Sequence, residues 1–529
     1  MEKRLIVAIV LSILVIVSFQ FLSPKPQRPP QVITGGEKIA PAGKQVLPQE
    51  SYQEEPAEEK TTIAETERYI LTFTSIGGSL KDVKLKEYRD PRTGAPLHLV
   101  QGAEGERAVF SVKSNTLTKG LDRRTFKLIK KERDRITYAY SIPGKFELTK
   151  KYRFYKSNDY IELRVSIHNL GKDTIYKDYD ILGASGMQPS GEAMGRRFIE
   201  IDSMVDGKLV RNTKVKNGEA VIKGIISWTG VKERYFCMVL KPQQDSEEVI
   251  LRQFGRSELA SGVRTKRLPI YPGTMLEDSY VLYIGPNDAV RLKTPGFGLE
   301  QIINYGVFGG ISKILLATLR VFHKVVRNWG VAIIMLTFLI NMILFPLTRK
   351  SFSAMHKMQE IQPHIEKMRK VHKDNPQKLN KELAELYKQY SVNPLGGCLP
   401  LLIQMPIFIA LYQGLIRSIE LKGANFLWIK DLSRPDYVPL PFTLPVLGNE
   451  IHILPLLMVG AMFFQQKIST KSTSGASPEQ KQQQKIMLIF FPLFFGFLFY
   501  NFPSGLVLYW LTNTVLMVVE HSVIRRKLQ

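Results

Sequence analysis

VAIIMLTFLINMILFPLTRK, residues 331–350, is an apolar run that ends in two basic residues. A helix needs about 20 mostly apolar residues to cross a bilayer, so this stretch predicts a transmembrane helix. It carries Asn341 past its middle and Thr337 one turn earlier. Lipid offers an amide no hydrogen-bond partner, so both side chains are expected to face protein or water.

The rest of the 529-residue chain predicts a polytopic membrane protein. A mean hydropathy of −0.08 averages a polar front half with a back half of long apolar runs. The predicted spans, six in all, are Leu5–Leu22, Gly330–Leu347, Cys398–Ile416, Ile451–Phe464, Ile486–Tyr500 and Leu506–Val519.

The formal net charge of +25 is explained by topology. Lys and Arg favour the cytoplasmic ends of spans. Basic residues precede the first span, fill Arg349–Lys388, bracket the fourth and fifth spans and follow the last span. Six crossings with both termini in the cytoplasm satisfy this pattern. Attraction to anionic lipids is expected, whereas sequence-specific nucleic-acid binding is not.

The front half divides into three predicted parts. Residues 1–22 form an N-terminal transmembrane anchor, uncleaved because no A-x-A site follows, and residues 23–62 form a disordered periplasmic linker rich in Pro, Gln and Glu. Residues 63–295 change to period two, most clearly in DYIELRVSIHNLG (159–171), which predicts half-buried antiparallel strands. A large periplasmic β-sandwich is therefore expected. Its Cys237 and the intramembrane Cys398 lie in different compartments, so no disulfide is expected.

Residues 296–328 predict an interfacial amphipathic helix. In ISKILLATLRVFHKVVRN an apolar stripe faces a basic stripe. The apolar stripe comprises Ile311, Ile314, Leu315, Phe322 and Val325, and the basic stripe comprises Lys313, Arg320, Lys324 and Arg327. The alternative is a helix packed on the β-domain.

After the second span (329–348), residues 349–392 predict a cytoplasmic helical hairpin, and residues 393–529 hold spans three to six with a cytoplasmic tail. Two amphipathic helices are joined by KDNPQ, with Asp374 or Asn375 as cap and Pro376 in the first turn. Its charged face is either a solvated surface or a docking surface for ribosome and targeting factors. The docking candidates are Lys367, Arg369, Lys370, Lys378 and Lys381.

No catalytic constellation, metal site or cofactor motif is found, so the chain is not expected to be an enzyme. The spans carry uncharged polar residues instead. They are Thr337, Asn341, Gln404, Tyr509, Trp510 and Asn513. One interpretation is a wet, half-open substrate groove between spans two, three and six; the alternative is that these side chains hold the helices together.

The membrane portion contains long motifs, which are NPLGGCLPLLIQMPIFIALY (393–412), FPLT followed by a basic hairpin, QQKIM (483–487) and FPSGLVLYW (502–510). These motifs resemble the YidC/Oxa/Alb family of membrane protein insertases. SIGGSL (75–80), ISWTGVKERYF (226–236) and YIGP (283–286) resemble the large periplasmic domain of the Gram-negative members.

This resemblance implies a five-helix insertase core in the inner membrane. Family members insert and fold newly made membrane proteins, alone or beside the Sec translocon, through a hydrophilic groove open to cytoplasm and lipid. Nascent membrane proteins, the Sec translocon and the ribosome are the partners implied. Counting back from FPLT, the family's groove arginine falls at Asn341, so this chain keeps the polar face without the cation.

Two rival functions remain at this stage. An ion or solute transporter predicts inverted repeats and an ionisable midplane site, and neither is found in the sequence. A carbohydrate-binding or mutarotase-like enzyme on an anchor accounts for the β-domain but leaves five further spans without a role. Deleting most of Ile63–Pro295 distinguishes an insertase from an outer-domain enzyme, because the insertase should keep working and the enzyme should lose its activity.

Overall fold

The computed structural model describes residues 58–89, 94–114, 116–187, 198–255, 258–293, 296–372, 375–390, 399–444, 448–470 and 478–528. The chain forms two compact units, Met1–Ile303 and Asn304–Gln529, here called the β unit and the helical unit. The predicted anchor at 1–22 and the linker up to residue 57 lie outside the described residues.

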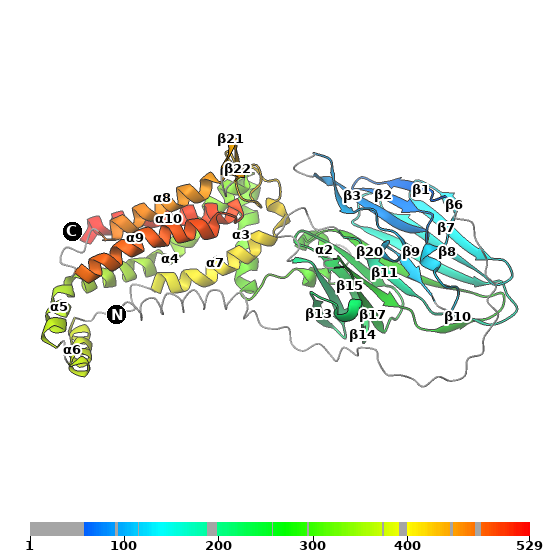
Figure 1. Ribbon diagram of the computed structural model, residues 1–529, viewed down its shortest axis with the longest axis horizontal. Coiled ribbons are helices and arrows are strands. Elements are labelled where there is room, and N and C mark those ends of the chain that lie inside the picture. Colours follow the sequence, from blue (N-terminus) through cyan, green and yellow to red (C-terminus); the bar gives the residue numbers. More distant parts are fainter. Residues whose placement is uncertain are drawn as a thin grey trace. The chain divides into compact units, whose positions relative to one another are not determined.

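The β unit consists of antiparallel sheets (Figure 1). A four-stranded sheet contains β1 (Thr61–Glu65), β2 (Tyr69–Thr74), β3 (Ser79–Arg89) and β4 (Pro96–Val100). A nine-stranded sheet has the order β13 (Lys208–Asn212), β12 (Glu200–Val205), β15 (Ile226–Lys232), β16 (Phe236–Pro242), β20 (Met275–Pro286), β9 (Tyr160–Asn169), β8 (Phe146–Phe154), β7 (Arg135–Ile142) and β6 (Lys127–Lys131).

A five-stranded sheet has the order β14 (Glu219–Lys223), β17 (Glu248–Phe254), β18 (Glu258–Arg264), β11 (Asp180–Ala184) and β5 (Ser111–Lys113). A small pair joins β10 (Ile175–Lys177) to β19 (Leu268–Ile270). Short 3-10 turns η1 (Gly105–Arg107), η2 (Leu121–Arg123) and η4 (Lys216–Gly218) connect strands.

Period-two patterning positions these strands as the sequence predicted. In β9, Ile161, Leu163, Val165 and Ile167 are buried, so the antiparallel β-domain is confirmed. The five-stranded sheet packs on the nine-stranded sheet at Gly183 of β11, where an added Cβ would lie 2.5 Å from the Leu240 Cβ.

The β unit is longer than the predicted 63–295. Strand β1 already begins at Thr61, and two short helices, α2 (Ala289–Lys293) and η5 (Leu299–Ile302), close the unit at its other end. Leu292, Leu299 and Ile302 pack into a cluster with Trp228 of the nine-stranded sheet. The predicted boundary missed them because a helix packed on a sheet interrupts the period-two pattern.

The helical unit is a bundle with a short β-hairpin (Figure 1). Its elements are α3 (Gly309–Val326), α4 (Trp329–Glu360), α5 (Gln362–Val371), α6 (Pro376–Gln389), α7 (Leu399–Arg417), η7 (Ile419–Leu421), β21 (Val438–Leu444), β22 (Gly448–Ile451), α8 (Ile453–Thr470), α9 (Pro478–Phe499) and α10 (Ser504–Leu528). Helix α10 packs against α4, α7 and α8, α9 packs against α8, and α3 packs against α4 and α7.

Within the described part of the chain, Trp329–Ala354 and Ser504–Val523 are long and apolar enough to cross a membrane. Ile453–Ile468 and Leu488–Phe499 are shorter apolar segments. Helix α7 coincides with the predicted third span. The helical C-terminal region is confirmed, whereas the count of six spans stays a prediction.

Helix α3 forms where predicted but buries a different face. Ser312, Leu316 and Leu319 are its buried residues, and the helix packs against α4 and α7. Ile314 and Val325 of the predicted apolar stripe are largely exposed. The helix therefore has a buried face, an exposed apolar face and a basic face. The sequence pattern separates apolar from basic residues, but it does not show which apolar residues contact a neighbouring helix.

Helix α4 does not end at residue 348, where the second span was predicted to end. It runs for 32 residues through Pro346 to Glu360 and so includes the start of the predicted hairpin. Helices α5 and α6 form the rest of the predicted hairpin, and Ile361, Ile365 and Leu386 are the buried residues of a small apolar cluster there. The Asn375 side chain caps α6 by accepting from the Lys378 backbone N–H at 3.1 Å, as one of the two predicted caps. Asp374 lies outside the described residues.

Candidate functional site

The polar residues of α4 meet α10 inside the helical unit. Thr337 Oγ1 donates to the Ile333 carbonyl at 2.7 Å, one turn back on its own helix. Asn341 Nδ2 donates to the Thr337 carbonyl at 2.9 Å and to Asn513 Oδ1 of α10, also at 2.9 Å. Spacing of four places Thr337 and Asn341 on one helix face, and Asn513 faces them across the α4–α10 contact.

A second polar pair joins α7 to α10. Gln404 Nε2 donates to the Tyr509 hydroxyl. Tyr509 and Asn513 lie four residues apart on α10, so one face of this helix carries both interhelical bonds. The two pairs Asn341–Asn513 and Gln404–Tyr509 are called the polar latch below.

Trp510 belongs to a different neighbourhood from the polar latch. Its ring lies 4.8 Å from Phe408, 5.6 Å from Phe495 and 5.3 Å from Phe499, centroid to centroid. These rings come from α7 and α9, so Trp510 joins an aromatic cluster between three helices. Trp510 was predicted with its polar neighbours because it is adjacent to Tyr509 in the chain, but adjacent residues of a helix are about 100° apart and so face different helices.

The polar latch is packed, not solvated, in this conformation. Thr337 and Tyr509 are 0% exposed, and Asn341, Gln404 and Asn513 are 8%, 7% and 6% exposed. This geometry agrees with the alternative in which the side chains hold helices together. Each buried amide gains a partner that lipid cannot supply.

Of the predicted docking residues, Lys367 and Arg369 lie exposed on α5, and Lys378 and Lys381 lie exposed on α6. The Lys370 side chain lies outside the described residues, although its backbone is part of α5. The two helices are tied by His372 Nε2, 2.7 Å from Glu382 Oε2.

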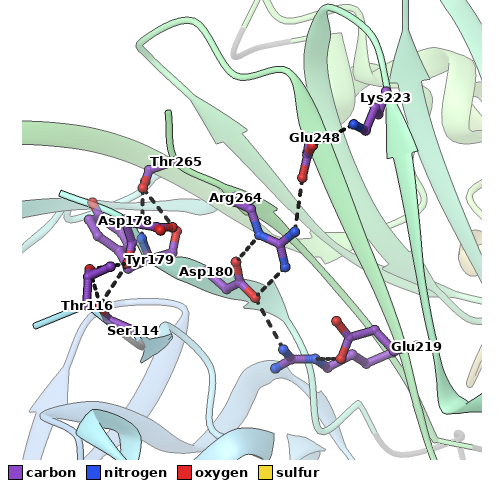
Figure 2. A network of polar contacts seen from close by, with 11 residues as sticks. Ser114, Thr116, Asp178, Tyr179, Asp180, Glu219, Lys223, Glu248, Arg264 and Thr265 are labelled. Carbon is purple, nitrogen blue, oxygen red and sulfur yellow. Dashed lines mark hydrogen bonds and ion pairs between the residues drawn. The ribbon is translucent and has the colours of Figure 1, made fainter. Parts of the chain in front are cut away.

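A cavity of about 400 Å³ opens on the five-stranded sheet of the β unit. Figure 2 shows the charged network beside it. The network is a chain of alternating charges running Lys223, Glu248, Arg264, Asp180, Arg252 and Glu219. The hydrogen bond from Arg264 to Asp180 raises the pKa of this guanidinium.

Register explains why these charges meet. Lys223 lies opposite Glu248, Glu248 opposite Arg264, and Arg264 opposite Asp180 in adjacent strands. Directly opposed residues on one face have Cβ atoms about 5 Å apart, close enough for an ion pair. The charges neutralise one another within the sheet, so the network is accounted for as sheet structure and we assign it no ligand.

Comparison with known proteins identifies the family. Residues 62–318 match the family model of the YidC periplasmic domain, and residues 321–529 match that of the 60Kd inner membrane protein. A membrane protein insertase YidC of Pelobacter propionicus is 33% identical over 555 residues, covering 99% of each chain. The chain belongs to the YidC family of membrane protein insertases.

Two further comparisons also concern YidC proteins. The YidC of Geobacter metallireducens is 31% identical over 551 residues, covering 100% of this chain and 99% of that one. A solved structure of an active YidC insertase with its first transmembrane domain resolved is 20% identical and covers 88% of this chain and 92% of that one, with a TM-score of 0.38. The YidC-family chain described here is thus an inner-membrane protein with a periplasmic domain.

One residue that holds the start of α8 in this YidC-family chain was not predicted from the sequence. Asp436 Oδ2 accepts the Leu454 backbone N–H at 2.8 Å, at the start of α8, and Trp428 Nε1 at 3.2 Å. A carboxylate directly before an apolar run predicts a helix N-terminus. Asp436, in RPD (434–436), is separated in sequence from the helix that it caps by the β21–β22 hairpin, so this local rule could not identify it.

Proposed function

We propose that this chain inserts newly made proteins into the inner membrane and assists their folding, alone or beside the Sec translocon. Family membership supports insertion as the activity. The observation that carries the mechanism is the polar latch, which concentrates uncharged polar groups of α4, α7 and α10 at one place in an apolar bundle.

The proposed groove is the opened state of the latch. A charged group at the bilayer centre costs about 3 kcal/mol on insertion scales. When the Asn341–Asn513 and Gln404–Tyr509 bonds exchange for bonds to water or to a passing backbone, Thr337 and both pairs line a wet path that shortens the dry crossing. The exchange costs little, because each broken hydrogen bond is replaced by another.

The substrate's apolar segment supplies the driving force. Its transfer from water to lipid is worth roughly 25 cal/mol per Å² of apolar surface. A substrate helix of about 20 apolar residues therefore partitions from the groove into lipid without nucleotide hydrolysis. Asn341 acts in this scheme through hydrogen bonds and not as a fixed charge.

The hairpin is the proposed receiving end on the cytoplasmic side, with both chain termini in the same compartment. The exposed cations Lys367, Arg369, Lys378 and Lys381 would meet the ribosome, targeting factors or anionic lipids. They would also repel basic substrate loops, which keeps those loops in the cytoplasm.

Site-specific photocrosslinking to a stalled nascent membrane protein tests this function. A crosslinker at Asn341 or Tyr509 should capture the nascent chain, and the same crosslinker at Met342, the exposed neighbour on the other face of α4, is the matched control. Crosslinks from Met342 with none from Asn341 and Tyr509 would reject the groove.

Substitution gives a second test in reconstituted vesicles. Asn341→Leu should slow the insertion of substrates with charged tails, since it removes an amide from the path. Asn341→Gln keeps the amide and should insert them at close to the original rate. Equal rates for both variants would contradict the role of Asn341.

A further inference from the structure

The segment between α7 and α8 is held by hydrogen bonds to the first residues of α10 and α8. The Leu432 carbonyl accepts the Gly505 N–H at 2.9 Å, and the Arg434 carbonyl accepts the Ser504 N–H at 2.7 Å, both at the start of α10. Asp436 caps the start of α8. The segment therefore lies at the same position along the bundle axis as the starts of α8 and α10.

The outer side of the same segment is apolar and aromatic. Leu427 is 75% exposed and Phe442 is 58% exposed, and Trp428 and Tyr437 of the same segment are partly exposed. The Lys430 ammonium lies 5.6 Å from the centre of the Tyr437 ring. We call this set, Leu427, Trp428, Lys430, Tyr437 and Phe442, the aromatic keel.

Leu427 is held outward against its backbone preference. Its φ is +51°, in the left-handed region that side chains with a Cβ disfavour. The turn is closed by paired hydrogen bonds between Phe426 and Ile429, each 2.8 Å long, and Ile429 is buried in the helical core. A soluble loop gains nothing from such a conformation, because it holds a large apolar side chain in water.

The aromatic keel is followed in the chain by exposed apolar residues of α8. Leu456 and Leu457, at the start of α8, are exposed apolar residues in an apolar helix. In Figure 1 the β21–β22 hairpin projects sideways from the end of the bundle, transverse to α8. Helix α3 lies at the same end, where Arg320 Nε and Glu420 Oε1 are 2.5 Å apart, and it exposes Ile314 and Val325.

We propose that the aromatic keel lies in the lipid of the bilayer leaflet at this end, at the boundary between headgroups and acyl chains. Trp and Tyr are enriched at this depth because an apolar ring meets lipid while its polar edge meets water or headgroup. Trp428 exposes part of its ring, while its indole N–H donates to Asp436 within the protein, so the ring can enter the interface without losing a hydrogen bond. Lys430 places its charge at the level of the phosphates.

The occupant is lipid and not a protein partner. The keel leads in sequence to the exposed Leu456 and Leu457 of an apolar helix, and the charge of Lys430 is complementary to anionic headgroups. It anchors the starts of α8 and α10 at a fixed depth in the bilayer, so neither helix shifts along the membrane normal while substrate passes. This role concerns lipid contact and is independent of the polar latch.

Spin labelling of the full-length protein in phosphatidylethanolamine and phosphatidylglycerol vesicles tests the proposal. Nitroxides are placed at Leu427→Cys and Phe442→Cys in a chain whose two native cysteines, Cys237 and Cys398, are replaced by alanine. Both labels should collide more with oxygen, which partitions into lipid, than with a water-soluble nickel chelate. Phe338→Cys on exposed α4 is the lipid control, and Tyr271→Cys on the exposed β unit is the aqueous control.

Depth and a second variant sharpen the result. The oxygen preference at Phe442→Cys should be smaller than at Phe338→Cys, because the keel lies nearer the headgroups. Phe442→Asp should shift a label at Leu427→Cys toward the nickel chelate. Preference for the chelate at both keel sites, as at Tyr271→Cys, overturns the proposal, and so does shielding from both reagents, which would indicate a protein contact.

Discussion

The β unit and the polar latch of the helical unit both bury polar side chains, but of different kinds. In the β unit, buried Lys177 meets buried Asp278 at 2.7 Å, and buried Lys232 meets Asp202 at 2.7 Å. The latch residues of the helical unit are uncharged amides and hydroxyls. A domain in water can fold around an ion pair, whereas removing a charge into a lipid-surrounded bundle costs more than an amide does.

The largest expected effect is the loss of stability when a buried ion pair of the β unit is broken, compared with an exposed ion pair of the same unit. Lys177→Met leaves Asp278 buried without its cation, so the opening free energy of the β unit should fall by about 3–5 kcal/mol. Hydrogen exchange of β9 and β20 peptides in the full chain measures this. Lys266→Met, which removes an exposed partner of Glu247, should cost under about 1 kcal/mol.

The double variant Lys177→Met/Asp278→Leu completes this test. Replacing both partners by apolar residues removes the unpaired charge and should recover most of the lost stability. A loss as large as that of the single variant would show that packing, and not the uncompensated carboxylate, sets the cost.

The next effect is a pH dependence confined to the β unit. Burial raises the pKa of Asp202 from 3.8 to about 6, while Lys232 opposes the rise. A carboxyl whose folded pKa is raised binds its proton more tightly in the native state. Stability from this group is therefore present at low pH and is lost as pH rises between 3.8 and about 6.

A pKa difference of one between the folded and unfolded states corresponds to about 1.4 kcal/mol, so this loss of stability is at most about 3 kcal/mol. Hydrogen exchange of β12 and β15 peptides at pH 4.5 and pH 7 in the intact chain and in Asp202→Asn measures it. The variant should lack this part of the pH dependence. Parallel pH profiles for the two proteins would refute the assignment.

The smallest effect concerns the helical unit. Asn341→Leu breaks the bond to Asn513, and interhelical hydrogen bonds in membranes average about 0.6 kcal/mol. Unfolding in mixed detergent micelles should show a loss of about 1 kcal/mol or less, and Met342→Leu on the exposed face should show none. A loss comparable to that of Lys177→Met would mean that the two units treat buried polarity alike.

Much of the fold was predictable because its patterns are local. Alternation in residues 159–171 gave β9, and the NP turn with Asn375 gave the start of α6. The spacing of Thr337 and Asn341 showed a polar helix face. These features depend on neighbours within a few residues.

What the sequence could not supply depends on distant partners. Asn341 and Asn513 are 172 positions apart, and nothing local indicates that they bond to each other. The buried face of α3 is set by α4 and α7, and the continuation of α4 through Pro346 is set by its packing. Conversely, Trp510 was grouped with the polar residues only because it is adjacent to them in the chain.

The alternating charges on the five-stranded sheet constrain how this sequence can drift. Each interior member, such as Glu248 or Arg264, touches two opposite charges, so reversing its sign creates two repulsions at once. Lineages should therefore alter these positions in pairs, or begin at the terminal members Lys223 and Glu219, where a single neighbour is affected.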